Sequence, residues 1–241
     1  MSLYFGLSSG LQQLEVSSVN VELVDNEFEG CTARVSTELG GNSYGGAVSI
    51  YIGGYSSVWN ASTAAALAGG TAARNVSVAL HGARFSSCIV ERSSYYNSTY
   101  GASVFGGSFS LYIGAYAWSY SRDGSSSSTI GAITASYISV SINYAPSFDC
   151  RAVTSSRRDS LGASSYGGSM SVLYVGAYAW SYSDYSISSS ASDYTAISAV
   201  SVSVSDAGCS NCRAATSSQG FSDGTNSYGG SMSVLYVGAY A

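Results

Sequence analysis

The amino-acid sequence predicts an all-β fold, a parallel β-helix (solenoid) in which successive coils stack on one another. Three observations predict it: about four copies of one unit of about 61 residues, runs of alternating apolar and small polar residues, and a composition suited to strands and turns. Of 241 residues, 28 are Gly, 21 are Tyr and one is Pro, and Ser makes up roughly 23%. Because Ser, Gly, Tyr, Val and Thr are mediocre or poor helix formers, a helical protein is disfavoured.

Each unit contains an alternating run, in which Val, Ile or Leu alternates with smaller or polar residues. The four copies are VNVEL (19–23), VSVAL (76–80), ISVSI (138–142) and VSVSV (200–204). A period of two is typical of a strand, and the Ser, Gly, Asn and Asp clusters around these runs are typical of turns. Because the strands recur at a fixed interval, we expect coils in which equivalent positions form ladders.

A cysteine motif follows each alternating run. Its copies begin at residues 28, 85, 148 and 209 and place Cys31, Cys88, Cys150 and Cys212 at one position of the unit. If a coil takes roughly 20–30 residues, each unit forms two or three coils. Equivalent cysteines then lie roughly 10–14 Å apart, farther than the ~7 Å that a disulfide spans between Cα atoms. This spacing favours buried cysteines over bridges between repeats or to another chain.

Cys209 is an additional cysteine, three residues before Cys212. The two could close a local disulfide or form half of a zinc site. A zinc site needs four ligands, however, and His81 is the only histidine in the chain. No βαβ pattern surrounds the pair, which disfavours a thioredoxin-like redox role. A local disulfide is therefore better supported than metal binding.

A pair of glycines completes the pattern of each unit. The pairs are Gly45 and Gly46, Gly106 and Gly107, Gly167 and Gly168, and Gly229 and Gly230, and they recur at the nearly constant interval of the repeat. The opening MSLYFGLSSG (1–10) is similar to the closing MSVLYVGAYA (232–241). We therefore expect a single array over 1–241, an excerpt of a longer array or a mature piece. Its units are approximately 17–74, 75–136, 137–198 and 199–241, with 1–16 as the tail of a preceding unit.

The cysteine and glycine motifs occur in a fixed order. FEGCTA (28–33) precedes GGAV (45–48), and FSSC (85–88) precedes the glycines at 106–107, whereas FDC (148–150) is one residue shorter. The order resembles the F-x-x-[N/C]-x-A and G-G-A-[IV] repeats of polymorphic outer membrane proteins and related surface proteins of bacteria and algae. The resemblance implies a right-handed parallel β-helix with a role in surface display, adhesion or wall structure. It implies no catalytic residue.

Aromatic residues recur in step with the repeat. One series is Tyr51, Tyr112, Tyr174 and Tyr236; a second series, with three tryptophans nearly in step, comprises Tyr55, Tyr116, Tyr178, Tyr240, Trp59, Trp118 and Trp180. Aromatic residues stacked in register stabilise ladders. The series is therefore either a core stack or an exposed stripe that binds sugars or docks neighbouring subunits, and the burial of the rings would distinguish the two.

Charge and chemistry exclude several functions. Only 10% of residues are charged, the nine basic residues are all Arg, and the net charge is −5, which disfavours nucleic acid as a partner. Six of the 14 acidic residues precede residue 39 and the rest are scattered, so no catalytic, metal or cofactor site is assigned. Glu22, Asp25, Glu27 and Glu29 suit a solvated edge better than a Ca²⁺-binding turn. No apolar run reaches the ~18–20 residues of a membrane-spanning helix.

Three N-glycosylation sequons begin at Asn60, Asn75 and Asn97, each a weak signal in a chain so rich in Ser and Thr. The sequence thus predicts a non-enzymatic extracellular or cell-surface structural subunit that associates with itself, head-to-tail or laterally, into a fibre or wall appendage. An adhesin that binds glycans through the Tyr and Trp stripe is the alternative. A carbohydrate-active β-helix enzyme is the second alternative.

Overall fold

The computed structural model describes residues 1–9, 14–36, 43–60, 66–68, 70–94, 99–100, 103–121, 128–130, 132–156, 160–161, 164–183, 190–192, 195–218, 222–223, 227–234 and 237–240. None of these residues lies in a helix, and their strands pair in parallel throughout. The predicted all-β fold with parallel strands is confirmed. The described part of the chain accordingly contains no apolar helix of bilayer-spanning length.

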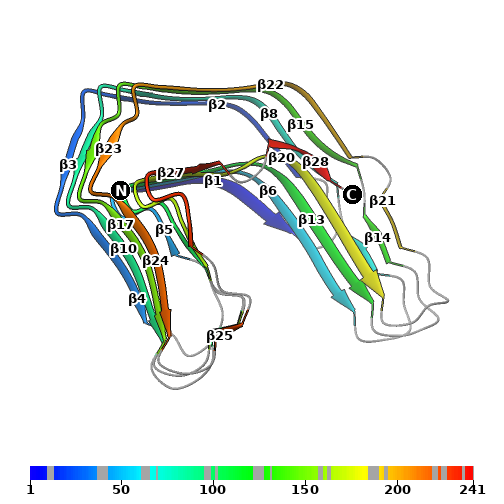
Figure 1. The fold of residues 1–241 in the computed structure, drawn as a ribbon. Helices are drawn as coiled ribbons and strands as arrows, with labels where there is room; N and C mark the ends of the chain where they lie inside the picture. The colour runs from blue at the N-terminus through cyan, green and yellow to red at the C-terminus, as the bar shows by residue number, and fades with distance from the viewer. Residues whose placement is uncertain are drawn as a thin grey trace.

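Two long sheets, one above the other, form the body of the molecule (Figure 1). The upper sheet contains β2 (Leu14–Val24), β8 (Thr71–His81), β15 (Ile133–Asn143) and β22 (Thr195–Ser205). The lower sheet contains β1 (Ser2–Ser9), β6 (Val48–Asn60), β13 (Phe109–Ser121), β20 (Met170–Ser183), β27 (Met232–Val234) and β28 (Val237–Tyr240).

Shorter strands connect the two sheets and extend them into two arms (Figure 1). A corner sheet contains β3 (Glu27–Glu29), β9 (Arg84–Ser86), β16 (Ser147–Phe148) and β23 (Cys209–Ser210). One arm has β4 (Thr32–Ser36), β10 (Ile89–Ser94), β17 (Arg151–Ser156) and β24 (Arg213–Ser218) on its outer side. On its inner side it has β5 (Ser43–Tyr44), β12 (Val104–Phe105), β19 (Ser165–Tyr166) and β26 (Ser227–Tyr228).

Two three-stranded sheets lie along the arms. The first arm also contains β11 (Thr99–Tyr100), β18 (Ser160–Leu161) and β25 (Ser222–Asp223). The distal halves of β6, β13 and β20 form the second arm, with β7 (Ala66–Ala68), β14 (Ser128–Ile130) and β21 (Ser190–Ser192) leading back to the upper sheet.

The two middle repeats each contribute one strand to every sheet, and one repeat makes one layer of the stack. The layers are β2–β7, β8–β14, β15–β21 and β22–β28, and β8 pairs directly with both β2 and β15. The expectation of two or three coils per repeat is therefore wrong. Two arms enlarge the cross-section, so that a single circuit around it uses the whole repeat.

The apolar core lies between the upper and lower sheets. The alternating runs direct every second side chain inward, so that Val76, Val78 and Leu80 are at most 1% exposed. They belong to one cluster with Ile50, Ile52, Leu111 and Ile113 of the lower sheet.

The first arm is stabilised by different contacts. Beside the small apolar cluster of Val90, Val104 and Ala152, it contains a chain of hydroxyl hydrogen bonds through Thr154, Ser165, Thr216 and Ser227.

Residues with positive φ recur at equivalent places in every layer. One series lies in the middle of the upper strands, at Ser18, Asn75, Tyr137 and Ala199. In β2, two successive exposed residues at 17 and 18 shift the phase of the inward–outward alternation. The alternating runs detected in the sequence begin at the next residue. Three further series mark corners: Asp25, Gly82, Tyr144 and Asp206; Gly30, Ser87, Asp149 and Asn211; and Gly45, Gly106, Gly167 and Gly229.

The glycine pairs combine two separate constraints. The first glycine of each pair has positive φ, for example 62° at Gly106. The second glycine lies against the neighbouring layer, since a Cβ added to Gly107 would collide with the carbonyl oxygen of Gly168. Each of the first three pairs therefore turns the chain and allows two layers to approach closely.

A single bulge makes the interval from Gly167 to Gly229 one residue longer than the interval from Gly106 to Gly167. Leu111 pairs with Val172 but Tyr112 pairs with Tyr174, so Leu173 is an extra residue in β20. Equivalent positions realign beyond it. The N-terminal β1 pairs with β6 in the same register and thus lies in the lower sheet with the C-terminal strands it resembles.

Candidate functional site: a groove lined by tyrosine ladders

Tyrosines of successive layers stack on each other along the lower sheet. The rings of Tyr51 and Tyr112 lie 4.6 Å apart between centroids at an interplanar angle of 3°, and Tyr4 extends the ladder beyond Tyr51 at 4.8 Å. A second ladder runs through Tyr55, Tyr116 and Tyr178, with separations of 5.2 and 5.0 Å. The backbone register also brings Tyr240 opposite Tyr178. The first ladder is in register because parallel pairing places identical residues one layer apart.

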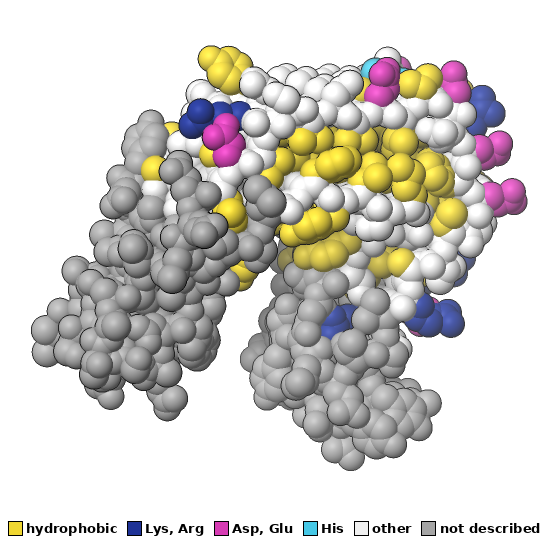
Figure 2. All heavy atoms as spheres, turned by 180° about the vertical axis from the view of Figure 1, so that it is seen from behind, with side chains coloured by type: hydrophobic (Ala, Val, Ile, Leu, Met, Phe, Trp, Pro, Cys, Tyr) yellow, Lys and Arg dark blue, Asp and Glu magenta, His cyan; other side chains and the backbone are white. Residues whose placement is uncertain are grey.

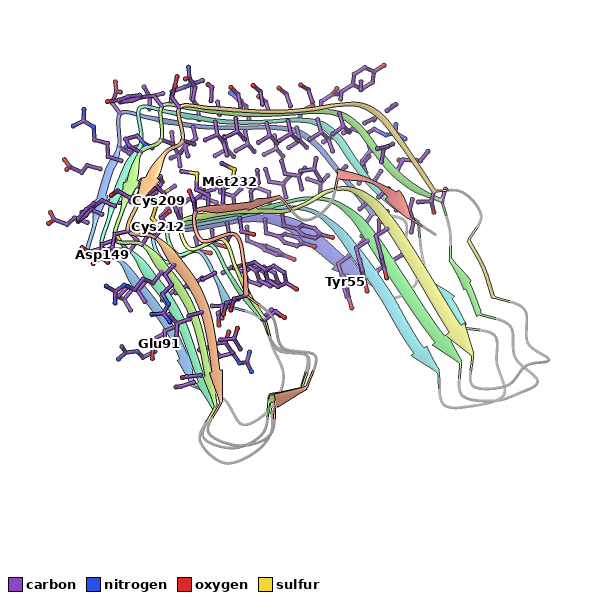
Figure 3. The ribbon with its side chains drawn as sticks, viewed as in Figure 1. Tyr55, Glu91, Asp149, Cys209, Cys212 and Met232 are labelled. Carbon is purple, nitrogen blue, oxygen red and sulfur yellow. A yellow bond between two sulfur atoms is a disulfide. The ribbon has the colours of Figure 1, made fainter. Side chains whose placement is uncertain are left out.

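The two ladders flank a cavity on the concave side of the molecule. Its volume is about 420 Å³, and it is lined by Tyr44, Ser49, Ile50, Tyr51, Tyr55, Ser110, Tyr112 and Tyr116. Figure 3 shows Tyr55 on this side, below the lower sheet and between the arms. The rings are half-buried, which is intermediate between the core stack and the exposed stripe considered from the sequence.

Burial opposes the ionisation of Tyr51 and Tyr116 and so raises the pKa of both. It raises the pKa of Tyr51 above its ordinary value, with further contributions from Tyr4, Tyr44 and Tyr55. Burial likewise raises the pKa of Tyr116 to about 12, and the neighbouring Tyr178 and Tyr55 add to the shift because one phenolate would repel the next. At neutral pH the groove therefore presents uncharged rings and hydroxyl groups.

The three tryptophans do not form one column. Trp118 pairs with Trp180, but Trp59 lies opposite Tyr120, because Trp59 and Trp118 are separated by slightly less than one repeat. Their indole side chains lie outside the part of the structure that is described. The register alone therefore separates Trp59 from the other two.

A further aromatic ladder was not predicted from the sequence. Tyr44, Phe105 and Tyr166 stack with separations of 5.3 and 4.9 Å on the inner side of the first arm, and Tyr44 lines the groove. The signal was available, because an aromatic residue precedes the glycine pair in all four units. Phe28 and Phe85 also stack, at 5.2 Å. In the third layer Ser147 takes that position and Phe148 turns outward, 56% exposed.

The repeated cysteines lie on adjacent layers, roughly 4.8 Å apart by strand spacing rather than the predicted 10–14 Å. Cys88 and Cys150 are fully buried and Cys31 is partly buried, and all three are free thiols. The single S–H of Cys88 can donate to the carbonyl oxygen of Phe28 or of Ser86, at 3.5 and 3.4 Å from the sulfur. Hydrogen bonding with Cys150 and burial both raise the pKa of Cys88.

Cys209 and Cys212 are joined by a disulfide within the fourth layer (Figure 3). Cys209 pairs with Ser147, in the column that Phe28 and Phe85 occupy in the first two layers. Among the described residues, no cluster of three or more His, Cys, Asp or Glu side chains could hold a metal ion.

Asn75 is exposed on the outer side of β8 with a φ of 51°. Asn60 is the last residue of β6, and its side chain lies outside the described part, as does the whole of Asn97. Glycosylation at the three sequons stays a prediction.

The acidic residues of the first layer are exposed around one end of the stack. Glu22, Asp25, Glu27 and Glu29 all point to solvent, and Glu15 lies 3.9 Å from Arg74 of the second layer. Figure 2 shows this end, with acidic and arginine side chains at the rim and hydrophobic side chains gathered in the middle. The end of the stack is therefore an apolar face with a charged border.

No protein-family model, curated protein or solved structure matches this chain significantly.

Proposed function

We propose that this chain is a non-enzymatic structural subunit, extracellular or at the cell surface, that stacks head-to-tail into a fibre or wall appendage. In this proposal the layers are coils of a right-handed parallel β-helix, as in the polymorphic outer membrane protein repeats that the sequence resembles. The observation that carries the proposal is the in-register stack, whose outermost strands in the described structure have neighbouring strands on one side only.

The columns of side chains can continue from one copy to the next. Val200, Val202 and Val204 of β22 are only partly buried, whereas their counterparts Val78 and Val140 in the middle layers are 1% exposed. A second copy whose β2 pairs with β22 would place its Val19, Val21 and Leu23 against them, and its β1 would then compete with β27 and β28 of the first copy for one position in the lower sheet. Unpaired strand edges favour this kind of addition, and each new layer would remove apolar surface from water.

The charges of the first layer favour one polarity of stacking. Glu15, Glu22 and Glu29 share columns with Ala196, Ser203 and Ser210 of the fourth layer. Head-to-tail stacking brings carboxylates against these uncharged residues. Head-to-head stacking would instead bring carboxylates of one copy against those of another across an apolar interface, which costs free energy. Head-to-tail stacking also continues the register, and among the described residues the one column in which it brings two carboxylates together is that of Asp25 and Asp206.

The stacked rings support a structural role over glycan binding. Sugars pack on exposed aromatic faces, whereas each inner ring of the two tyrosine ladders has its faces against the rings of adjacent layers. The disulfide between Cys209 and Cys212 supports an oxidising compartment, as an extracellular location would provide.

The test compares two substitutions on neighbouring residues of β22. Val202→Lys places a charge in the inward-facing column and should prevent stacking, whereas Ser203→Lys places it on the exposed outer side. Electron microscopy and sedimentation should show filaments for the native chain and for Ser203→Lys, and monomers for Val202→Lys. Circular dichroism checks that both variants fold. A native chain that stays monomeric at high concentration contradicts the proposal.

A further inference from the structure

We propose that the groove between the tyrosine ladders is a binding site for elongated, planar, conjugated aromatic molecules that lie parallel to the stacking axis. This inference goes beyond the structural role, because the groove belongs to each single chain and needs no second copy.

The walls of the groove come from alternate positions of one strand. Tyr51 and Tyr55 are four residues apart in β6, which separates their backbones by about 13 Å at about 3.3 Å per residue. Ser49, two residues before Tyr51, also lines the groove, whereas Gly53, midway between the two tyrosines, is buried and does not. Ser110, Tyr112 and Tyr116 repeat this arrangement in the next layer. The result is a slot that spans two layers along the axis, since both layers contribute the same three lining positions.

The walls offer ring edges rather than ring faces. Because the rings stack at 4.6 and 5.2 Å with angles of 3° and 5°, their faces are largely occupied by each other. The edge of an aromatic ring carries partial positive charge and its face carries partial negative charge. A flat conjugated molecule inserted along the slot turns its faces toward these edges on both sides. The electrostatic complementarity is therefore that of edge-to-face aromatic contacts, repeated in each layer.

The polarity and size of the cavity fit the same class of ligand. Its lining contains no formally charged side chain, and the hydroxyl groups of Ser49 and Ser110 already bond to each other at 3.3 Å. The raised pKa values of Tyr51 and Tyr116 keep the phenols neutral. A volume of about 420 Å³ lies within the roughly 300–1,000 Å³ typical of small-molecule sites.

Thioflavin T and its uncharged benzothiazole–aniline analogue are suitable probes, because both are flat rods, and thioflavin T fluoresces when its internal rotation is restrained. We expect both to bind the native chain saturably, with increased fluorescence of thioflavin T, and to bind the non-stacking Val202→Lys variant equally. Tyr112→Ala removes part of one wall and should weaken binding at least tenfold. Tyr137→Ala is the matched control, since Tyr137 is 66% exposed on the outer side of β15.

A second variant keeps the test decisive if Tyr112→Ala fails to fold. Ser49→Trp leaves both ladders intact and fills the groove from the partly exposed Ser49, so it should also abolish binding. Circular dichroism monitors the fold of each variant. Unchanged binding in the folded groove variants overturns the proposal. Binding that occurs only in filaments, or binding of cationic thioflavin T without binding of its uncharged analogue, also overturns the proposal. Displacement of the probe by oligosaccharides overturns it as well and would identify a glycan site.

Discussion

At the scale of single residues, equivalent positions are constrained by the layers above and below them. Gly107 illustrates this, because a Cβ there would meet the carbonyl oxygen of Gly168 and the backbone of Arg151 at once. Both obstacles are backbone atoms of the next layer, Gly168 in the bend before β20 and Arg151 in β17, which cannot move without disturbing the pairing of that layer. Glycine is thus required by the close approach of chains as well as by a turn.

We predict that Gly107→Ala lowers the free energy of unfolding by at least ~2 kcal/mol, as expected for overpacking against fixed atoms. Gly208→Ala is the matched control, because a Cβ at Gly208 has no neighbour within 4 Å, and its effect should stay within about 0.5 kcal/mol. Urea denaturation followed by circular dichroism measures both. Equal effects of the two substitutions would refute the role assigned to close packing at Gly107.

At the scale of elements, the tyrosine ladders link the stability of the strands to pH. Tyr116 keeps its proton up to about pH 12 in the folded chain, because burial and then Tyr178 and Tyr55 oppose its ionisation. In the unfolded chain a tyrosine loses its proton near pH 10. The ladder's contribution is therefore complete below about pH 10 and is lost as the pH rises from there toward 12.

The predicted outcome is a fall in the free energy of unfolding, measured by urea denaturation, between pH 9 and pH 11.5. Tyr116→Phe, which keeps the stacked ring but cannot ionise, should reduce that fall by on the order of 1–2 kcal/mol. Tyr137→Phe, at an exposed ring, should leave it unchanged. A native chain whose stability is constant over this interval would show that the ladder phenols ionise as they do in the unfolded chain.

The elements also show how far the sequence could predict the fold. The alternation of apolar and polar residues predicted that Val76, Val78 and Leu80 point inward. The sequence repeat predicted that Tyr55, Tyr116 and Tyr178 form a ladder. The period did not reveal how many circuits each repeat makes, since the sequence repeats at the same interval whether a repeat makes one circuit or three. Likewise, the residue types of Tyr137 and Ala199 do not indicate a positive φ. These residues have a positive φ because they are equivalent to Ser18 and Asn75, which adopt the same conformation in the neighbouring layers.

At the scale of the whole molecule, stability should vary along the stacking axis. The inward-facing side chains of the two middle layers are covered on both sides, whereas those of β22 are partly exposed. Since local opening depends on how many buried contacts are lost, the outer layers should open more often than the middle ones. The same asymmetry makes the outer layers the surfaces where stacking would produce the largest change.

We therefore predict that amide hydrogens of residues 200–204 exchange faster than those of residues 76–80 and 138–142 in the monomer, as measured by hydrogen–deuterium exchange with mass spectrometry. In the stacked state the three segments should become similarly protected, because residues 200–204 acquire a neighbouring layer. The Val202→Lys variant should keep the gradient at every concentration. If association instead protected amide hydrogens only on the outer faces of the sheets, the chains would associate laterally. The strand edges at the ends of the stack would then stay unpaired.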